Sequence, residues 1–131
     1  MVRKLGIFSL FLLFFVLSCA TVQDPLTGKT TFTLLPPEQE IAIGKKVIPE
    51  AINENDGLYP DEEVQNYIKN LGYKIASKSP RQVDYQFFLV NSKEVNAFAL
   101  PGGPVFVNRG LILILDNESE LAGVIAHEVG H

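Results

Sequence analysis

The sequence has few residues of the types that form cross-links or bind metals. It contains one cysteine, Cys19, and two histidines, His127 and His131, in 131 residues. A single thiol cannot form an intramolecular disulfide, which excludes a disulfide-stabilised scaffold. No internal repeat, no glycine-rich phosphate loop and no Ser/His/Asp arrangement is present. Any chemistry in this chain therefore has to come from a small set of residues.

Positive charge is also scarce. The chain has 11 Lys and Arg against 15 Asp and Glu, a net charge of −4. Nucleic-acid binders, and proteins held on anionic lipid by charge, need a basic surface. The composition therefore predicts no nucleic-acid partner. The 47% hydrophobic and 20% charged residues are ordinary values for a globular protein of one domain.

The first 18 residues have the pattern of a secretory signal peptide. Arg3 and Lys4 precede an uncharged run at residues 5–17, and small residues follow it from Ser18. The run is shorter than the roughly 20 apolar residues that span a bilayer. We therefore expect residues 1–18 to be a cleaved signal peptide, with an uncleaved membrane anchor as the alternative.

Cys19 stands directly after this apolar run. The Val-Leu-Ser-Cys sequence that ends there resembles the bacterial lipobox, in which the cysteine is lipidated and becomes the first residue of the mature protein. The alternative is an incidental small residue near a cleavage site. Lipidation predicts a membrane lipoprotein of the bacterial cell envelope facing the periplasm, with residues 19–35 as a tether. Ala20, in place of Asp after the cysteine, favours the outer membrane over the inner one.

Residues 36–131 carry periodic apolar patterns that predict helices and strands. An amphipathic helix begins at Pro36-Pro37 and ends or kinks at Pro49, and residues 53–60 form a loop. The other predicted elements are a helix from Asp61 to Pro80, a strand at 83–90, extended segments at 95–100 and 105–108 flanking a Pro-Gly-Gly-Pro turn, and an apolar segment at 111–115 that favours a helix over a strand. Together they predict an α+β domain, with helices packed on a small, mainly antiparallel sheet.

The last predicted helix carries the chemistry. Asn117 is its predicted N-cap and Glu120 its capping-box partner. His127 and His131 are four residues apart, so both imidazoles can reach one zinc ion from the same helix face. Glu128 lies one step round the helix, where its carboxylate can accept a proton from water without being a ligand. The alternative is an amphipathic helix with two surface histidines.

Several further stretches lead up to the HEVGH sequence: VNAFALPGG at 95–103, VFV at 105–107, RGL at 109–111, and ESELA at 118–122. Together with HEVGH they resemble peptidase family M48, the BepA-like and HtpX-like zinc metallopeptidases. The similarity extends upstream through residues 24–28, 39–44 and 61–67. The resemblance implies a zincin-like fold, Zn²⁺ as the cofactor, His127 and His131 as zinc ligands, and Glu128 as the catalytic base.

The resemblance also implies a substrate platform and a third ligand. Val105, Phe106 and Val107 would form an edge strand that holds a peptide in extended form, with Gly102 and Gly103 near the cleft. In the family, a glutamate on a later helix is the third protein ligand. We therefore expect that ligand beyond His131, and residues 36–131 to be the N-terminal part of a metallopeptidase domain.

Two functions fit these observations. The first is a zinc metalloendopeptidase of the bacterial envelope that hydrolyses misfolded or misassembled envelope proteins. The second is a lipid-anchored envelope chaperone or scaffold that binds extended segments without proteolysis. Glu128 favours the enzyme, because a binding protein has no need of a carboxylate between the two histidines.

Overall fold

The computed structural model describes residues 21–23, 30–32, 36–81 and 83–131. The chain divides into two units, Met1–Leu34 and Leu35–His131. In the first unit, β1 (Thr21–Gln23) pairs antiparallel with β2 (Thr30–Phe32), two short strands that the sequence analysis did not predict within the tether. The predicted signal peptide and Cys19 lie outside the described residues. Among the residues described, no helix is both long enough and apolar enough to cross a membrane.

Helix α1 (Pro37–Glu54) opens the second unit. Its first turn carries two acidic side chains, Glu38 and Glu40, which the helix dipole favours there. The helix continues through Pro49, so of the two predicted alternatives, an end or a kink at that residue, the end is wrong. A proline removes one intrahelical hydrogen bond, but Ile48, Ala51 and Ile52 around it pack against the sheet and hold the helix together.

Helix α2 (Glu62–Ala76) confirms its sequence signals. The Asp61 carboxylate accepts a hydrogen bond from the Val64 N–H at 3.1 Å, as an N-cap should. Its inner face contributes Ile68 to the core, and the side chain of Gln65 bonds to the Leu89 backbone in β3. The helix is therefore fixed to the sheet by both apolar packing and hydrogen bonds.

The sheet has three strands in the order β3-β5-β4. Strand β3 (Gln86–Val90) begins three residues later than predicted, β4 is Ala97–Ala99, and β5 is Pro104–Asn108. Strands β4 and β5 are antiparallel, but β3 and β5 are parallel, so the sheet is mixed and the prediction of a mainly antiparallel sheet holds for one of its two pairs. After β3 the chain crosses to the far side of the sheet and forms β4. The glycine turn then joins β4 to β5, which lies between β3 and β4 and runs parallel to β3.

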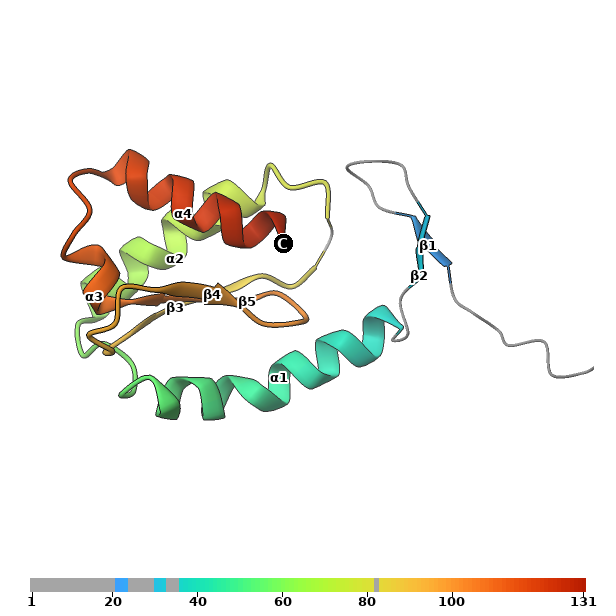
Figure 1. Cartoon of the computed structure of the whole chain (residues 1–131), viewed down its shortest axis with the longest axis horizontal. Coiled ribbons are helices and arrows are strands. Elements are labelled where there is room, and N and C mark those ends of the chain that lie inside the picture. Colours follow the sequence, from blue (N-terminus) through green and yellow to red (C-terminus); the bar gives the residue numbers. More distant parts are fainter. Residues whose placement is uncertain (1–20, 24–29, 33–35, 82) are drawn as a thin grey trace, which may run out of the picture. The chain divides into compact units, whose positions relative to one another are not determined.

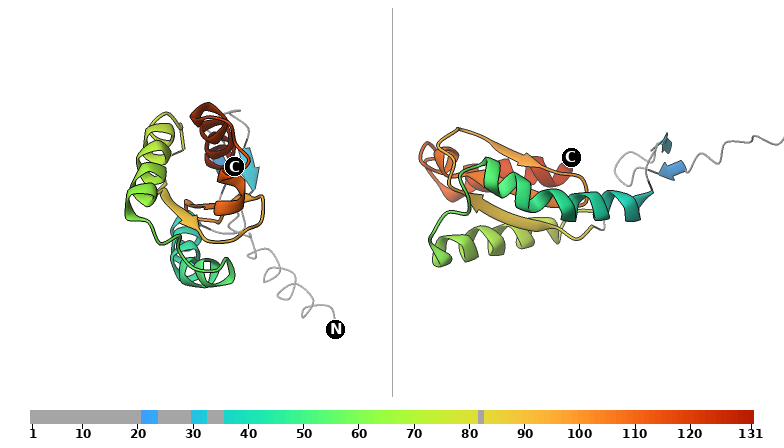
Figure 2. Two further views of the ribbon diagram at one scale, coloured as in Figure 1. Left: turned by 90° about the vertical axis from the view of Figure 1, so that its left-hand side faces the viewer. Right: turned by 90° about the horizontal axis from the view of Figure 1, so that it is seen from below.

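Helices cover both faces of this sheet. Figures 1 and 2 show α2 and α4 (Glu118–Gly130) on one face and α1 on the other, with the short helix α3 (Arg109–Ile112) following β5. The core beneath α2 and α4 consists of Ile68, Phe87, Leu89, Val105, Val107, Leu111, Leu121, Ile125 and Val129. On the α1 side, Phe106 lies between Phe88 and Phe98, with ring centroids 5.1 and 4.9 Å away. The α+β fold class is confirmed, as is the helical preference of the segment after β5.

Candidate active site

Helix α4 presents the HEVGH sequence at its C-terminal end. The Asn117 side chain accepts a hydrogen bond from the Glu120 N–H at 3.1 Å, which confirms the predicted N-cap. The Glu120 carboxylate accepts in return from the N–H of Asp116, one residue before the cap, at 3.0 Å. Leu121 and Ile125 are buried against the sheet. The helix is thus fixed in rotation, and its histidines face away from the core.

A second contact fixes the start of α4 to α2. The Tyr67 hydroxyl donates to a carboxylate oxygen of Glu118 at 2.5 Å. This hydrogen bond, helped by partial burial and by the negative charge of Glu118, raises the pKa of Tyr67 above its usual 10.0. The two helices that cover one face of the sheet are therefore joined by a polar contact as well as by their apolar faces.

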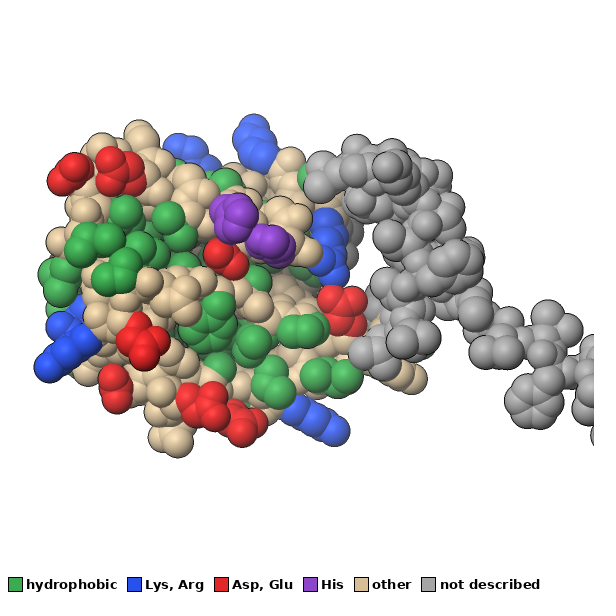
Figure 3. Space-filling model, in the orientation of Figure 1, with side chains coloured by type: hydrophobic (Ala, Val, Ile, Leu, Met, Phe, Trp, Pro, Cys, Tyr) green, Lys and Arg blue, Asp and Glu red, His purple; other side chains and the backbone are tan. Residues whose placement is uncertain are grey.

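The two imidazoles converge on one point. Their Nε2 atoms lie 3.0 Å apart, with ring centroids at 4.5 Å and planes at 82°. Figure 3 shows both histidines side by side on the surface. Two nitrogens bound to one tetrahedral zinc ion at about 2.0–2.1 Å would be about 3.3 Å apart. The arrangement of His127 and His131 therefore fits two ligand positions of a single ion.

No third ligand joins the pair within the part of the chain that the structure describes. Across residues 36–81 and 83–131 and the two short strands, no three His, Cys, Asp or Glu side chains gather in a way that could hold a metal ion. Catalytic zinc sites use three protein ligands and a water. The glutamate expected beyond His131 stays a prediction.

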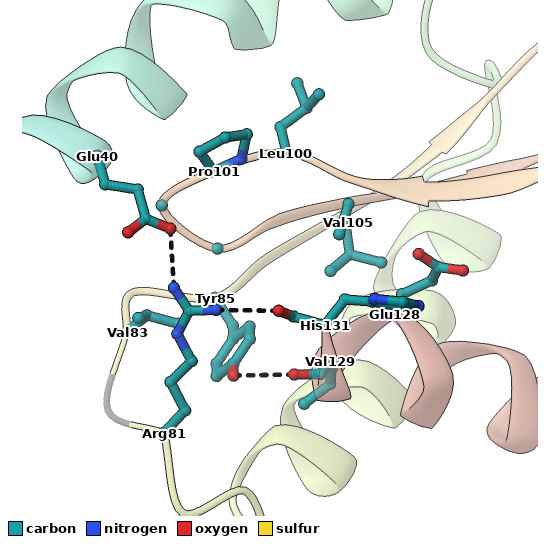
Figure 4. Close-up of a pocket in the computed structure, with 13 residues that line it drawn as sticks. Glu40, Arg81, Val83, Tyr85, Leu100, Pro101, Val105, Glu128, Val129 and His131 are labelled. Atoms are coloured by element: carbon teal, nitrogen blue, oxygen red, sulfur yellow. Dashed lines mark hydrogen bonds and ion pairs between the residues drawn. The ribbon is translucent and has the colours of Figure 1, made fainter. Parts of the chain in front are cut away.

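Glu128 lies at a cavity of about 230 Å³ that opens beside the end of α4. The side chain is half-buried, whereas both histidines are exposed. Figure 4 shows the cavity between α4, the turn joining β4 to β5, the segment before β3 and the start of α1. It is lined by Glu40, Arg81, Val83, Tyr85, Ala99, Leu100, Pro101, Gly102, Gly103, Val105, Glu128, Val129 and His131. A carboxylate and one imidazole of the motif thus border a space that a substrate side chain could enter.

Gly102 and Gly103 form the tight turn at this cavity. Both have positive φ, at 94° and 108°, where other residues are strained. A Cβ on Gly102 would lie 2.8 Å from the Cα of Ile41, and one on Gly103 would lie 2.7 Å from the Asp84 carbonyl oxygen. Turn geometry and close backbone packing therefore account for both glycines, which also line the predicted cleft.

The prediction that residues 105–107 form an edge strand is wrong. Val105, Phe106 and Val107 are fully buried, and β5 pairs with a neighbour on each side. Its backbone N–H and C=O groups are already used by β3 and β4, so it cannot add a peptide strand. Strands β3 and β4 each pair with β5 alone and form the two edges of this sheet. On β3 the backbone of Leu89 is already bonded to the Tyr59 N–H and the Gln65 side chain, so β4 has the more open edge. Val105 still contributes its side chain to the cavity wall.

Three polar residues of the cavity wall were not predicted as site residues. Arg81 pairs with Glu40 at 2.8 Å, and Tyr85 bonds to the backbone of α4. Glu40 falls in the first predicted helix, Tyr85 in the strand predicted at 83–90, and Arg81 between the predicted helix that ends at Pro80 and that strand. No sequence signal identifies them, because their partners are more than 40 residues away along the chain.

Comparison with known proteins identifies the family. The model of peptidase family M48 matches residues 59–131, from the end of the α1–α2 loop to the last histidine. The chain belongs to peptidase family M48. This confirms the resemblance found in the sequence, and it covers more than half of the chain.

Curated M48 relatives extend the match. The chain is 35% identical over 108 residues to the beta-barrel assembly-enhancing protease of Yersinia pestis and 34% identical to that of Escherichia coli K12. Each alignment covers 82% of this chain and 22% of the relative. The mitochondrial metalloendopeptidase OMA1 of Arabidopsis thaliana is 34% identical over 80 residues, covering 60% of this chain and 16% of its own length. The M48 chain therefore spans less than a quarter of these relatives.

Proposed function

We propose that this M48 protein is a zinc-dependent metalloendopeptidase, with His127 and His131 as zinc ligands and Glu128 as the general base. The observation that carries the proposal is the convergence of the two Nε2 atoms, 3.0 Å apart, beside a half-buried glutamate at a cavity. Membership of a peptidase family and the names of the relatives, a protease and a metalloendopeptidase, agree with it.

Each residue of the motif would have a separate role in peptide hydrolysis. Zinc, when bound, lowers the pKa of a water to about 7 and polarises the scissile carbonyl. His127 and His131 would hold the ion through their Nε2 atoms. Glu128 accepts a proton from the attacking water and passes it to the nitrogen of the leaving amine. A glutamate on a later helix would complete the ligand set.

The structure suggests how a peptide would bind. The outer side of β4 (Ala97–Ala99) is the more open of the two edges of the described sheet, because Leu89 of β3 is already bonded to Tyr59 and Gln65. An extended segment could therefore add to β4 by backbone hydrogen bonds. A side chain of that segment could enter the cavity beside Glu128. Recognition through the backbone suits unfolded segments of many sequences. We propose misfolded or misassembled proteins of the bacterial envelope as substrates, reached from a lipid anchor at Cys19.

Two variants of the full-length gene product test the proposed function. Glu128→Gln should keep zinc and lose peptidase activity by several orders of magnitude, because the ligands remain while the proton acceptor is gone. His127→Ala should lose the metal. Metal content by elemental analysis and cleavage of an unfolded protein such as casein measure the two effects.

Glu120→Gln is the matched control, since that carboxylate lies at the other end of α4. It should keep both zinc and activity. Full hydrolysis by Glu128→Gln would contradict the proposal. Binding of unfolded protein by wild type without cleavage, in the presence of bound zinc, would instead favour the chaperone.

A further inference from the structure

A pair of opposite charges lies in the wall of the cavity beside Glu128. Arg81 Nη2 donates to a carboxylate oxygen of Glu40 at 2.8 Å, and the two side chains are 40% and 28% exposed. Figure 4 shows this pair and Glu128 at opposite sides of the cavity, with the Tyr85 ring between them. A side chain that entered the cavity beside Glu128 would therefore have the ion pair on the opposite wall.

Each member of the pair is also positioned by contacts that do not involve the other. Glu40 lies in the first turn of α1, which packs closely on the glycine turn: a Cβ on Gly102 would lie 2.9 Å from the Glu40 carbonyl oxygen. The Arg81 backbone N–H donates to the Ser79 Oγ at 3.2 Å. Removing the charge of one residue should therefore leave the charge of the other in the wall.

The rest of the cavity is mainly apolar. Apart from the pair and the two residues of the HEVGH sequence, the side chains that line it belong to Val, Ala, Leu, Pro and Tyr residues. Its volume of about 230 Å³ is below the roughly 300–1,000 Å³ of pockets that hold whole small molecules, so the cavity suits a single side chain. A charged side chain loses hydration in such a space and needs an opposite charge as compensation. Glu40 and Arg81 already neutralise each other.

We propose that Glu40 and Arg81 are specificity-determining residues for the peptidase. Their mutual neutralisation makes the cavity a subsite for uncharged side chains of an unfolded substrate. Glu40 prevents Arg81 from attracting acidic side chains, and Arg81 prevents Glu40 from attracting basic ones. The inference rests on the proposed function, because it concerns the peptide that the enzyme cleaves.

Peptide cleavage by the full-length gene product tests the proposal. Quenched fluorescent peptides would differ only in one residue next to the scissile bond, on either side of it, which would be leucine, glutamate or lysine. The kcat/KM of each charged peptide is divided by that of the leucine peptide, so that a general loss of activity cancels. Mass spectrometry of the products confirms that all peptides are cut at the same bond.

The two single variants should shift these ratios in opposite directions. Glu40→Gln leaves the Arg81 cation, and the ratio for the glutamate peptide should rise about fivefold, the upper end of what a partly exposed ion pair contributes. Arg81→Gln leaves the Glu40 carboxylate and should raise the ratio for the lysine peptide by a similar factor. Both shifts should shrink as the salt concentration is raised, because exposed charges are screened.

The double variant separates charge from structure. Glu40→Gln combined with Arg81→Gln removes both charges, so both ratios should return to within twofold of the wild-type values. A pair that only holds the wall together would give no opposite shifts in the single variants and no return in the double one. Melting temperatures of all variants identify any that are not folded.

Glu38→Gln is the matched control, because Glu38 lies in the same turn of α1 as Glu40 but outside the cavity wall. It should leave both ratios unchanged. Cleavage by wild type with the same ratios in all variants overturns the inference and leaves the proposed function intact. An equal shift in Glu38→Gln also overturns it. A zinc-loaded wild type that cleaves none of the peptides, and no unfolded protein, refutes the proposed function and the inference with it.

Discussion

Gly44 provides a direct test of how the cavity wall is built. It lies in α1 beneath the turn between β4 and β5, and a Cβ placed on it would approach the carbonyl oxygen of Pro101 about 1 Å inside the 3.0 Å limit that real Cβ contacts respect. The opposing atom belongs to the backbone, so no side-chain rotation relieves the overlap. In Gly44→Ala, either α1 or the turn has to move.

The size of the effect follows from two opposing contributions. Overpacking of this kind costs about 1–3 kcal/mol. Alanine in a helix interior is favoured over glycine by about 0.5–1 kcal/mol. Because the overlap involves rigid backbone, we expect the upper part of the cost and a net loss of about 1–2 kcal/mol. For a domain of about 100 residues, this lowers the melting temperature by roughly 5–10 °C.

Gly123→Ala is the matched control for Gly44→Ala. Gly123 lies inside α4, and a Cβ placed on it would meet no atom within 4 Å. Only the propensity gain remains, so this variant should be more stable than wild type by about 0.5–1 kcal/mol. Thermal unfolding followed by circular dichroism on protein without residues 1–18 measures both. A Gly44→Ala variant that melts at or above the wild-type temperature would refute the packing argument.

Three further predictions concern other parts of the chain. Mass spectrometry of the membrane fraction should find an acylated Cys19 as the first residue, and an N-terminus at Met1 or an unmodified Cys19 would exclude the lipoprotein. The raised pKa of Tyr67 predicts a stabilising contribution that is present below pH about 10 and lost as the pH rises through the folded-state value. Tyr67→Phe and Glu118→Gln should each abolish that pH dependence in urea unfolding. A polypeptide cut after His131 should bind zinc weakly and hydrolyse nothing, because two imidazoles supply only half of a tetrahedral shell; titration calorimetry that finds a tight one-to-one complex would contradict this.

Local signals predicted the helices well. Asp61 and Asn117 were identified as N-caps, and both accept from the backbone N–H three residues later. Such bonds depend on a few neighbouring residues, so the sequence alone contains them. The spacing of His127 and His131 is a signal of the same kind, since one helical turn brings the two imidazoles together.

Strand order was not predictable from the same kind of signal. Edge and central strands can share one periodicity, and pairing partners are chosen by packing between distant segments. Val105, Phe106 and Val107 nevertheless form an uninterrupted apolar run, which is typical of a strand covered on both faces. That run would have favoured the centre of the sheet for β5, with β3 and β4 as its two edges.

The family-like residues of this chain divide into two groups with different physical roles. His127, Glu128 and His131 are the residues proposed to bind metal and transfer a proton, whereas Gly44 and Gly102 permit α1 and the turn between β4 and β5 to approach closely. Sequence resemblance alone does not separate these groups, because both follow from one shared fold. The structure separates them: the first three side chains lie at the surface or the cavity, whereas the two glycines lie against backbone atoms of a neighbouring element. A substitution in the second group should therefore act on the cavity wall through stability, while one in the first should act on metal binding or proton transfer in a folded protein.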